Sequence, residues 1–279
     1  MQTFRSFLFV PGDRPERFDK ALASGADAVV LDLEDAVAPP AKAAARQAVQ
    51  QWLAAQAGNP RTVLRINDES SSWFADDLAL LAALSASPGA SPAAVMLPKA
   101  ERVDTLARVL AAAPGVALLP LVESARGVLA AAALASAPGV QRLVFGTLDY
   151  ALDMDLQGPL ADSVGLDVPA AALAMASRAA GIGSPVAGVT PALDVEPRLR
   201  ADLDRARAHG FGAKLCIHPR QVAAVHAAFA PSADELAWAQ RVLQAAATAQ
   251  AQAAGAVQLD GRMIDKPVIE RARRIVARA

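Results

Sequence analysis

The chain has few of the residues that build disulfides and zinc sites. Cys216 is the only cysteine among 279 residues, so an intramolecular disulfide and a cluster of thiolate zinc ligands are both excluded. The histidines, His209, His218 and His226, do not form the HExxH spacing or any other zinc-binding spacing. The sequence therefore gives no indication of zinc.

Segments that would direct the chain to a membrane are also missing. The N-terminal apolar run covers only Phe7–Val10, which is too short for a signal peptide. No apolar run of about 18 residues is free of charges and helix breakers. The 27 basic and 28 acidic residues give a net charge of −1, so bulk charge does not attract nucleic acid or an anionic membrane. We expect a soluble, cytoplasmic protein without a nucleic-acid or membrane partner.

Short apolar runs that resemble strands alternate with helical patterns along most of the chain. The expected strands are Ser6–Val10, Ala28–Leu33, Thr62–Ile66, Ala94–Leu97, Ala117–Val122, Arg142–Phe145, Pro185–Val189 and Ala213–Ile217. The expected helices are Pro15–Ser24, Lys42–Gln56, Trp73–Ser85, Val103–Ala111, Ser124–Ser136, Val168–Ala180, Glu196–His209 and Gln221–Phe229. Length and count together predict an α/β fold, a (β/α)₈ TIM barrel. A doubly wound open sheet is the alternative, but GxGxxG after the first strand and GxxxxGK[ST] are absent. The GxSxG motif of serine hydrolases is also absent.

The barrel pattern ends near residue 230. After it, Ala233–Ala254 predicts an alanine-rich helix, and a basic helix is expected from Val268. We therefore expect a catalytic barrel over residues 1–230 and a C-terminal helical extension over residues 231–279. The extension could be a lid, an oligomerisation arm or a helix on the bottom face of the barrel.

Two of the expected strands lead into carboxylates. Glu123 follows the fifth strand directly, and Asp149 follows the sixth within the same alternating pattern. Active sites of (β/α)₈ barrels lie at the carboxyl ends of the strands. Two hard oxygen ligands there predict a Mg²⁺ site. The alternative is that both carboxylates cap the helices that follow them.

Other charged residues also fall at predicted strand ends. Arg65 shares one face of its strand with Val63 and Asn67, so it is expected to face the barrel interior. A guanidinium there needs a partner, either a substrate carboxylate or one of Glu34 and Asp32. Glu34 and Asp35 could hold metal-bound waters, or form salt bridges to Arg14 or Arg65.

Two lysines raise the possibility of a different chemistry. Lys99 and Lys214 could form a Schiff base with a carbonyl substrate if burial lowers their pKa. The alternative, which we favour, is a lysine paired with a strand-end carboxylate or a phosphate.

Eight segments in order resemble the citrate lyase β-subunit-like proteins of the HpcH/HpaI aldolase family, and they span nearly the whole chain. They are LFVPGDRPERFDKA, VVLDLEDAV, VLRIND, VMLPKAE, LLPLVESARGV, LVFGTLDYALD, AKLCIHPRQV and DGRMIDKP. The resemblance implies a (β/α)₈ barrel that assembles as a homotrimer or hexamer and uses Mg²⁺. It also implies cleavage or formation of carbon–carbon bonds in short hydroxy acids, carried as CoA or acyl-carrier-protein thioesters.

The resemblance also assigns roles to individual residues. The family's metal carboxylates match Glu123 and Asp149, and its substrate-binding arginine matches Arg65. The aspartate that reaches a neighbouring subunit's site in the acyl-CoA lyase branches matches Asp265, which becomes the candidate proton donor. The loop that contains Arg14, together with Lys99, lies where relatives contact the thioester or the carboxylate. Without the resemblance, Asp265 is expected only to cap the helix near Val268.

These roles predict a Mg²⁺-dependent lyase or synthase acting on a citryl-, malyl- or citramalyl-CoA type of thioester, with a 2-oxo acid and an acyl-thioester as products. Three alternatives stay open. The chain could be the β subunit of a citrate lyase complex acting on an acyl-carrier-protein thioester, a malyl-CoA thioesterase, or a non-catalytic metabolite-binding barrel.

Overall fold

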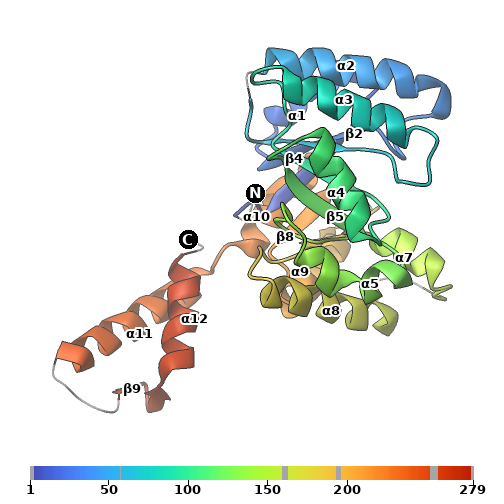
Figure 1. Cartoon of the computed structure of the whole chain (residues 1–279). Helices are drawn as coiled ribbons and strands as arrows, with labels where there is room; N and C mark the ends of the chain where they lie inside the picture. Colours follow the sequence, from blue (N-terminus) through green and yellow to red (C-terminus); the bar gives the residue numbers. More distant parts are fainter. Residues whose placement is uncertain (1–2, 57, 159–162, 193–195, 252–256, 278–279) are drawn as a thin grey trace. The chain divides into compact units, whose positions relative to one another are not determined.

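Eight short parallel strands close into a barrel in sequence order, from β1 through β8 and back to β1 (Figure 1). The computed structural model describes residues 3–56, 58–158, 163–192, 196–251 and 257–277. The strands are β1 (Ser6–Pro11), β2 (Ala28–Asp32), β3 (Thr62–Arg65), β4 (Ala94–Leu97), β5 (Ala117–Val122), β6 (Val144–Phe145), β7 (Val186–Ala187) and β8 (Ala213–Cys216). This topology confirms the predicted TIM barrel and excludes the open sheet.

Apolar side chains fill the barrel interior, and they follow the two-residue alternation of the strands. The interior cluster includes Phe7, Val30, Val63, Leu121 and Leu215. Two residues further along their strands, the same face carries Asp32 on β2, Arg65 on β3 and Glu123 just after β5. The register pairs Asp32 directly with Arg65. The alternation therefore places charged groups only at the carboxyl ends of these strands.

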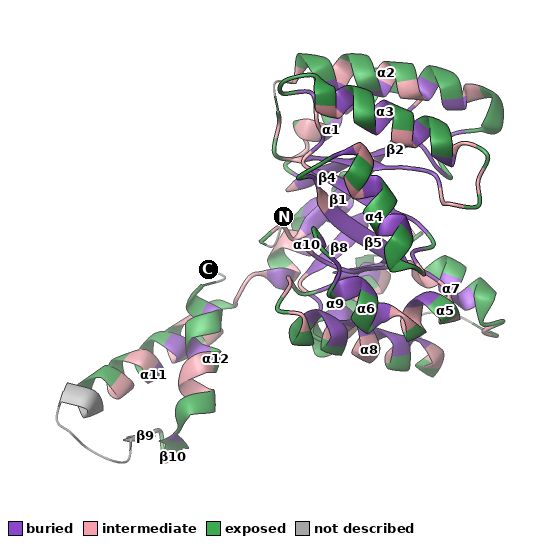
Figure 2. Ribbon diagram, viewed as in Figure 1, coloured by how far each residue is buried: buried purple, intermediate pink, exposed green. Residues whose placement is uncertain are grey.

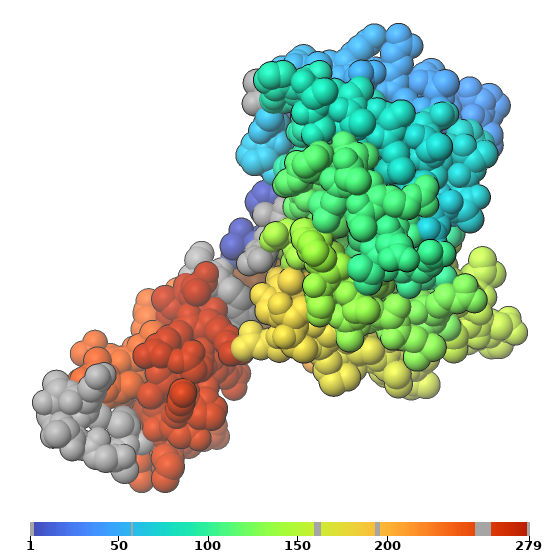
Figure 3. Space-filling model, in the orientation of Figure 1, coloured from blue at the N-terminus to red at the C-terminus, as the bar shows by residue number. Residues whose placement is uncertain are grey.

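Helices connect the strands and cover the barrel. They are η1 (Pro15–Arg17), α1 (Phe18–Leu22), η2 (Pro39–Ala41), α2 (Lys42–Ala55), α3 (Phe74–Ala86), α4 (Val103–Ala112), α5 (Ala125–Leu129), α6 (Ala131–Ala135), α7 (Thr147–Asp153), η4 (Val164–Leu166), α8 (Asp167–Ala179), α9 (Glu196–Ala208) and α10 (Arg220–Phe229). The strands are buried and the helices expose their outer faces (Figure 2). On the face drawn in Figure 3, side chains of these helices cover the strands.

Two differences between the observed helices and the predicted pattern lie after the fifth and sixth strands. The helix expected over Ser124–Ser136 is divided into α5 and α6 at Ala130, whose ψ of −2° departs from helical geometry. Residues 147–153 form a helix, α7, where the sequence pattern predicted a continuing strand and a loop. The second difference changes how Asp149 reaches the site.

The chain forms two compact units, Met1–His226 and Ala227–Ala279. The second unit contains α11 (Ala233–Ala251), the antiparallel pair β9 (Val257–Leu259) and β10 (Arg262–Ile264), and α12 (Lys266–Val276). Its own apolar core includes Val242, Ile264 and Ile275. The last residues of the predicted helix Ala233–Ala254 lie outside the described residues. None of the described helices has the length and apolarity needed to cross a bilayer.

Candidate metal and substrate site

A cavity of about 320 Å³ lies at the carboxyl ends of the barrel strands. Four of the predicted site residues line it: Asp35, Arg65, Glu123 and Asp149. The remaining lining residues are Phe9, Asp32, Ala36, Leu121, Gly146, Thr147, Leu148, Val189, Leu215 and Ile217. The fold thus brings these charged groups, which are distant in sequence, to one mainly apolar cavity.

Arg65 is held by carboxylates of β2 and the loop after it. Its Nε and Nη2 donate to the two oxygens of Asp32, at 2.7 and 2.6 Å, and its Nη1 lies 2.8 Å from Glu34 Oε2. The guanidinium also stacks over the Phe9 ring, with its Cζ 4.7 Å from the ring centroid. Burial acts to lower the pKa of Arg65, but the ion pairs with Asp32 and Glu34 raise it, so the charge is kept. Arg65 therefore has the intramolecular partners that were the alternative to a substrate carboxylate.

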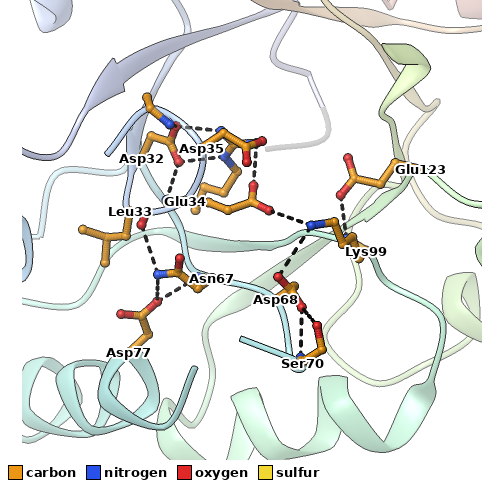
Figure 4. A network of polar contacts seen from close by, with 12 residues as sticks. Asp32, Leu33, Glu34, Asp35, Asn67, Asp68, Ser70, Asp77, Lys99 and Glu123 are labelled. Atoms are coloured by element: carbon orange, nitrogen blue, oxygen red, sulfur yellow. Dashed lines mark hydrogen bonds and ion pairs between the residues drawn. The ribbon is translucent and has the colours of Figure 1, made fainter. Parts of the chain in front are cut away.

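Glu34 joins Arg65 to a second cation, Lys99. The Nζ of Lys99 lies 3.8 Å from Glu34 Oε1 and 3.6 Å from Asp68 Oδ2 (Figure 4). Burial raises the pKa of Glu34 to about 8, against the opposing effect of Arg65. Burial acts to lower the pKa of Lys99, but Asp68 and Glu34 raise it overall. Lys99 is thus paired with carboxylates, which is the arrangement that we favoured over a Schiff-base lysine.

Glu123 is buried, and its position is fixed by backbone groups on both sides. The backbone N–H of Lys99 donates to its Oε1 at 2.7 Å, and Lys99 adopts a left-handed conformation with a φ of 47°. On the other side Gly146 passes so closely that a Cβ there would lie 2.4 Å from Glu123 Oε2. Burial, together with the charge of nearby Asp149, raises the pKa of Glu123 to about 7. Gly146 is therefore a site residue that sequence reasoning missed, although a glycine after a strand can signal close backbone approach.

Asp149 reaches the cavity from a helix and not from a strand. Strand β6 ends at Phe145, and Asp149 lies in the first turn of α7. Our placement of Asp149 on a strand face was therefore wrong, because the strand alternation ends before this residue. A carboxylate in a first helical turn is stabilised by the helix dipole. The cavity position of Asp149 follows from the tight β6–α7 connection at Gly146.

The capping alternative for these two carboxylates is not what the structure shows. The helix after Glu123 is capped by Ser124, whose Oγ accepts from the backbone N–H of Gly127 at 3.1 Å. The N-cap of α7 is Gly146, three residues before Asp149. Neither Glu123 nor Asp149 is an N-cap residue, so both carboxylates are available to the cavity.

Four predicted site residues are not among those that line this cavity: Glu34 and Lys99, described above, and Arg14 and Asp265. Arg14 lies before η1, with its Nη1 3.9 Å from Glu16 Oε1, and about half of its side chain is exposed. Asp265 belongs to the second unit and caps α12, accepting from the backbone N–H of Val268 at 3.1 Å. The structure therefore gives Asp265 the capping role that local sequence indicated.

A buried polar network behind Glu34 was also missed. Lys42 Nζ donates to the carbonyls of Leu33 and Glu34 and to Asn67 Oδ1, at 2.6, 2.7 and 2.7 Å. The Nδ2 and backbone N–H of Asn67 both donate to Asp77 Oδ2 at 2.7 Å (Figure 4). The network fixes the loop that presents Glu34 to Arg65. Local pattern could not reveal it, because its members come from four separate elements.

We expect Lys42→Met to lower stability and activity together. The substitution leaves two buried carbonyls and Asn67 without their donor, and each lost partner costs about 1–3 kcal/mol. The free energy of unfolding in urea and kcat/KM measure the two effects. Lys20→Met removes an exposed lysine of α1 and is the matched control. Equal stability of the two variants would show that the network does not position the loop.

Comparisons with known proteins agree with this geometry. Residues 5–219 match the family model described as HpcH/HpaI aldolase/citrate lyase, and residues 173–279 match a C–C bond lyase family of the TIM-barrel fold. A citrate lyase subunit β-like protein of Mycobacterium tuberculosis is 38% identical over 98% of this chain and 94% of its own length. A (3S)-malyl-CoA thioesterase of Cereibacter sphaeroides is 34% identical over 99% of this chain and 94% of its own length.

A solved structure shows the same architecture. The protein CitE of Mycobacterium tuberculosis, in complex with magnesium, acetoacetate and coenzyme A, superimposes with a TM-score of 0.80 and 35% identity. The superposition covers 100% of this chain and 99% of the other. The matched family model spans most of the chain, the barrel is closed, and both family carboxylates line one cavity. On these grounds the chain belongs to the HpcH/HpaI aldolase/citrate lyase family.

Proposed function

We propose that this protein is a Mg²⁺-dependent carbon–carbon lyase, or synthase, that acts on a short hydroxy-acid thioester of the citryl-, malyl- or citramalyl-CoA type. The products of cleavage are a 2-oxo acid and an acyl-thioester. The observation that carries the proposal is the convergence of Glu123, Asp149 and Arg65 on one cavity. Similarity to a protein solved with magnesium, acetoacetate and coenzyme A supports it.

The residues present fit a magnesium ion. Glu123 and Asp149 offer carboxylate oxygens, which Mg²⁺ prefers, and the ion commonly keeps waters in its other positions. Gly146 allows the backbone to pass against Glu123, since a Cβ there would lie 2.4 Å from Oε2 and 2.6 Å from the Cβ of Glu123. When bound, magnesium supplies Lewis-acid stabilisation of the charge that develops on substrate oxygens.

Arg65 orients the substrate carboxylate in this proposal. A guanidinium has five N–H donors. Within the described structure two of them donate to Asp32, and Nη1 forms an ion pair with Glu34. The others can contact a substrate that enters the cavity. Because Asp32 and Glu34 fix the guanidinium plane beforehand, substrate binding need not order the Arg65 side chain. The thioester enolate that leaves after cleavage needs a proton, for which Asp265 of a neighbouring subunit is our candidate.

The proposal includes several features that rest on the resemblance. These are assembly as a homotrimer or hexamer through residues 231–279, a cytoplasmic location, and contacts of Arg14 and Lys99 with the thioester. Glu34 and Asp35 would hold metal-bound waters. Among the described residues, Asp35 lines the cavity with a largely exposed side chain, and Glu34 is buried behind Arg65.

A panel of CoA thioesters, assayed by mass spectrometry with Mg²⁺ present, tests the reaction. A lyase releases a 2-oxo acid and an acyl-CoA, whereas a thioesterase releases the intact hydroxy acid and free coenzyme A. The second outcome would favour the thioesterase alternative, which similarity to a (3S)-malyl-CoA thioesterase supports. Turnover only with acyl-carrier-protein thioesters would indicate a citrate lyase β subunit. Binding without turnover of any thioester would indicate a non-catalytic barrel.

We expect no Schiff base with a 2-oxo acid. Lys99 is held charged beside Asp68 and Glu34, and a charged ammonium is not a nucleophile. Lys214 is not among the residues that line the candidate site. Borohydride added together with pyruvate should leave the protein mass unchanged. A reduced adduct on Lys99 or Lys214 would replace the metal mechanism by a lysine mechanism.

A further inference from the structure

A second cavity lies outside the barrel, between the outer face of β6–β8 and helices α8 and α9. Its volume is about 190 Å³. Phe145, Ala187 and Lys214 reach it because their strand neighbours Val144, Val186 and Ala213 point into the barrel. The wall opposite the strands includes Ala170 of α8, Arg198 and Asp202 of α9, and Phe211. The cavity shares Thr147, Leu148 and Val189 with the candidate site, but none of Arg65, Glu123 and Asp149.

Lys214 is the unusual group in this cavity. It is only 3% exposed, and its Nζ donates to the carbonyl of Gly188 at 2.6 Å. Among the residues that the structure describes, that carbonyl is its single hydrogen-bond partner, and no carboxylate lies within ion-pair distance. An ammonium carries three donors, and a buried charge is costly unless it is paired. Lys214 therefore faces the cavity with unused hydrogen-bonding capacity.

The carboxylates near the cavity are already engaged by other groups. Asp202 is 3.1 Å from Arg198 Nε, and its other oxygen accepts from Thr190 Oγ1 at 2.5 Å. Burial lowers the pKa of Lys214 to about 8. The charge of Asp202 acts to raise this pKa but does not offset the burial.

The second carboxylate, Asp167, is already engaged by Arg205 and His209. It lies 2.8 Å from Arg205 Nη2 and 3.1 Å from His209 Nε2. Asp202 and Asp167 thus each pair with an arginine of α9, whereas no carboxylate among the described residues pairs with Lys214 on β8.

We propose that this cavity binds a small organic carboxylate, whose carboxylate pairs with Lys214 Nζ and whose apolar chain packs on Phe145, Ala170 and Phe211. An inorganic anion would satisfy the ammonium but would leave the apolar wall without a partner. A neutral apolar molecule would cover the wall and leave the ammonium unpaired. The site is separate from the proposed catalytic function and does not depend on it.

Calorimetric titration of the full-length protein with hexanoate tests the proposal. Wild-type protein should bind hexanoate more tightly than hexan-1-ol, which has the same chain without the charge, and more tightly than inorganic phosphate. Lys214→Met should weaken hexanoate binding about tenfold or more, because a charge-assisted hydrogen bond is lost. The control variant Lys20→Met, on α1, should bind as the wild type does.

A second variant keeps the test decisive if Lys214→Met does not fold. Ala170→Leu fills the cavity from α8 and keeps the ammonium, and it should also lose hexanoate binding. Equal binding of hexanoate by wild type and either folded variant overturns the proposal. Equal binding of hexan-1-ol, or tighter binding of phosphate, overturns it as well, since the first indicates a purely apolar void and the second an inorganic anion site.

Discussion

Glu123→Gln should abolish the response of the protein to magnesium and lower kcat by about 10³-fold or more. Loss of a metal that stabilises developing charge removes several kcal/mol of transition-state stabilisation, and each 1.36 kcal/mol corresponds to a factor of ten. Glutamine keeps the oxygen that accepts from the Lys99 backbone N–H, so the local hydrogen bond survives. The substitution therefore removes the charge and leaves the shape.

Thermal unfolding gives a readout that does not depend on activity. A ligand that binds only the folded state raises the melting temperature, so Mg²⁺ should stabilise the wild type but not Glu123→Gln. Without Mg²⁺ and above pH 7, Glu123→Gln should be at least as stable as the wild type. The pKa of Glu123 is raised from 4.5 to about 7. Between these pH values the unfolded chain releases the proton and the folded wild type keeps it, so the stability of the wild type falls as the pH rises through this window.

Glu101→Gln is the matched control for this prediction. Glu101 lies on the neighbouring loop, where it accepts from Ser124 Oγ at 2.6 Å, and it is not among the cavity-lining residues. This variant should keep both the magnesium response and the activity. If Glu123→Gln still shows the wild-type shift in melting temperature with Mg²⁺, the assignment of Glu123 as a ligand is wrong.

Asp265→Asn should lower kcat by about 10²–10⁴-fold, the usual cost of losing a general acid, with almost no change in melting temperature. Asparagine is as good an N-cap residue as aspartate, so the cap on α12 is kept. Asp265→Ala removes the cap as well and should in addition cost about 1 kcal/mol of stability. Comparison of the two variants separates the cap from the acid.

Hybrid oligomers test whether Asp265 acts across a subunit interface. Mixing Asp265→Asn with Glu123→Gln should restore part of the activity, because some interfaces would then combine an intact Asp265 with an intact Glu123. Arg65→Ala is a poorer partner, since it would leave Asp32 and Glu34 buried without their cation at a cost of about 3–5 kcal/mol. Near-normal kcat in Asp265→Asn, or no recovery in any mixture, would refute the shared site. Asp260→Asn, which changes an exposed aspartate of the same unit, is the control.

The sequence by itself determined the barrel and its chemistry in outline. Strand alternation is a local property, so the run from Val63 to Arg65 was sufficient to point the guanidinium inward. The same reasoning placed Glu123 on the inner face of its strand end, which the cavity lining agrees with. The family motifs extended this to a lyase class, and the comparisons confirmed the family.

Only the tertiary structure decided which groups these side chains meet. The choice of Asp32 and Glu34 as partners of Arg65 depends on the register between β2 and β3, which no local pattern specifies. In the Lys42 network the Nδ2 of Asn67 also donates to the carbonyl of Leu33, which lies 34 positions away in the sequence. Such contacts depend on how the helices and strands pack, so the residue types alone do not show which side chains will meet.

Asp149 and Lys214 are two further residues whose surroundings the sequence pattern could not predict. Asp149 is part of the cavity although the strand argument for it failed, because the β6–α7 turn at Gly146 brings the first turn of a helix to the strand end. Lys214 alternates with inward-facing Ala213 and Leu215, so it faces the helices and not the barrel interior. In the part of the chain that the structure describes, no carboxylate pairs with Lys214, because Asp202 pairs with Arg198 and Asp167 pairs with Arg205. Sequence supplies the charge, and the packing of the helices decides whether that charge finds a partner.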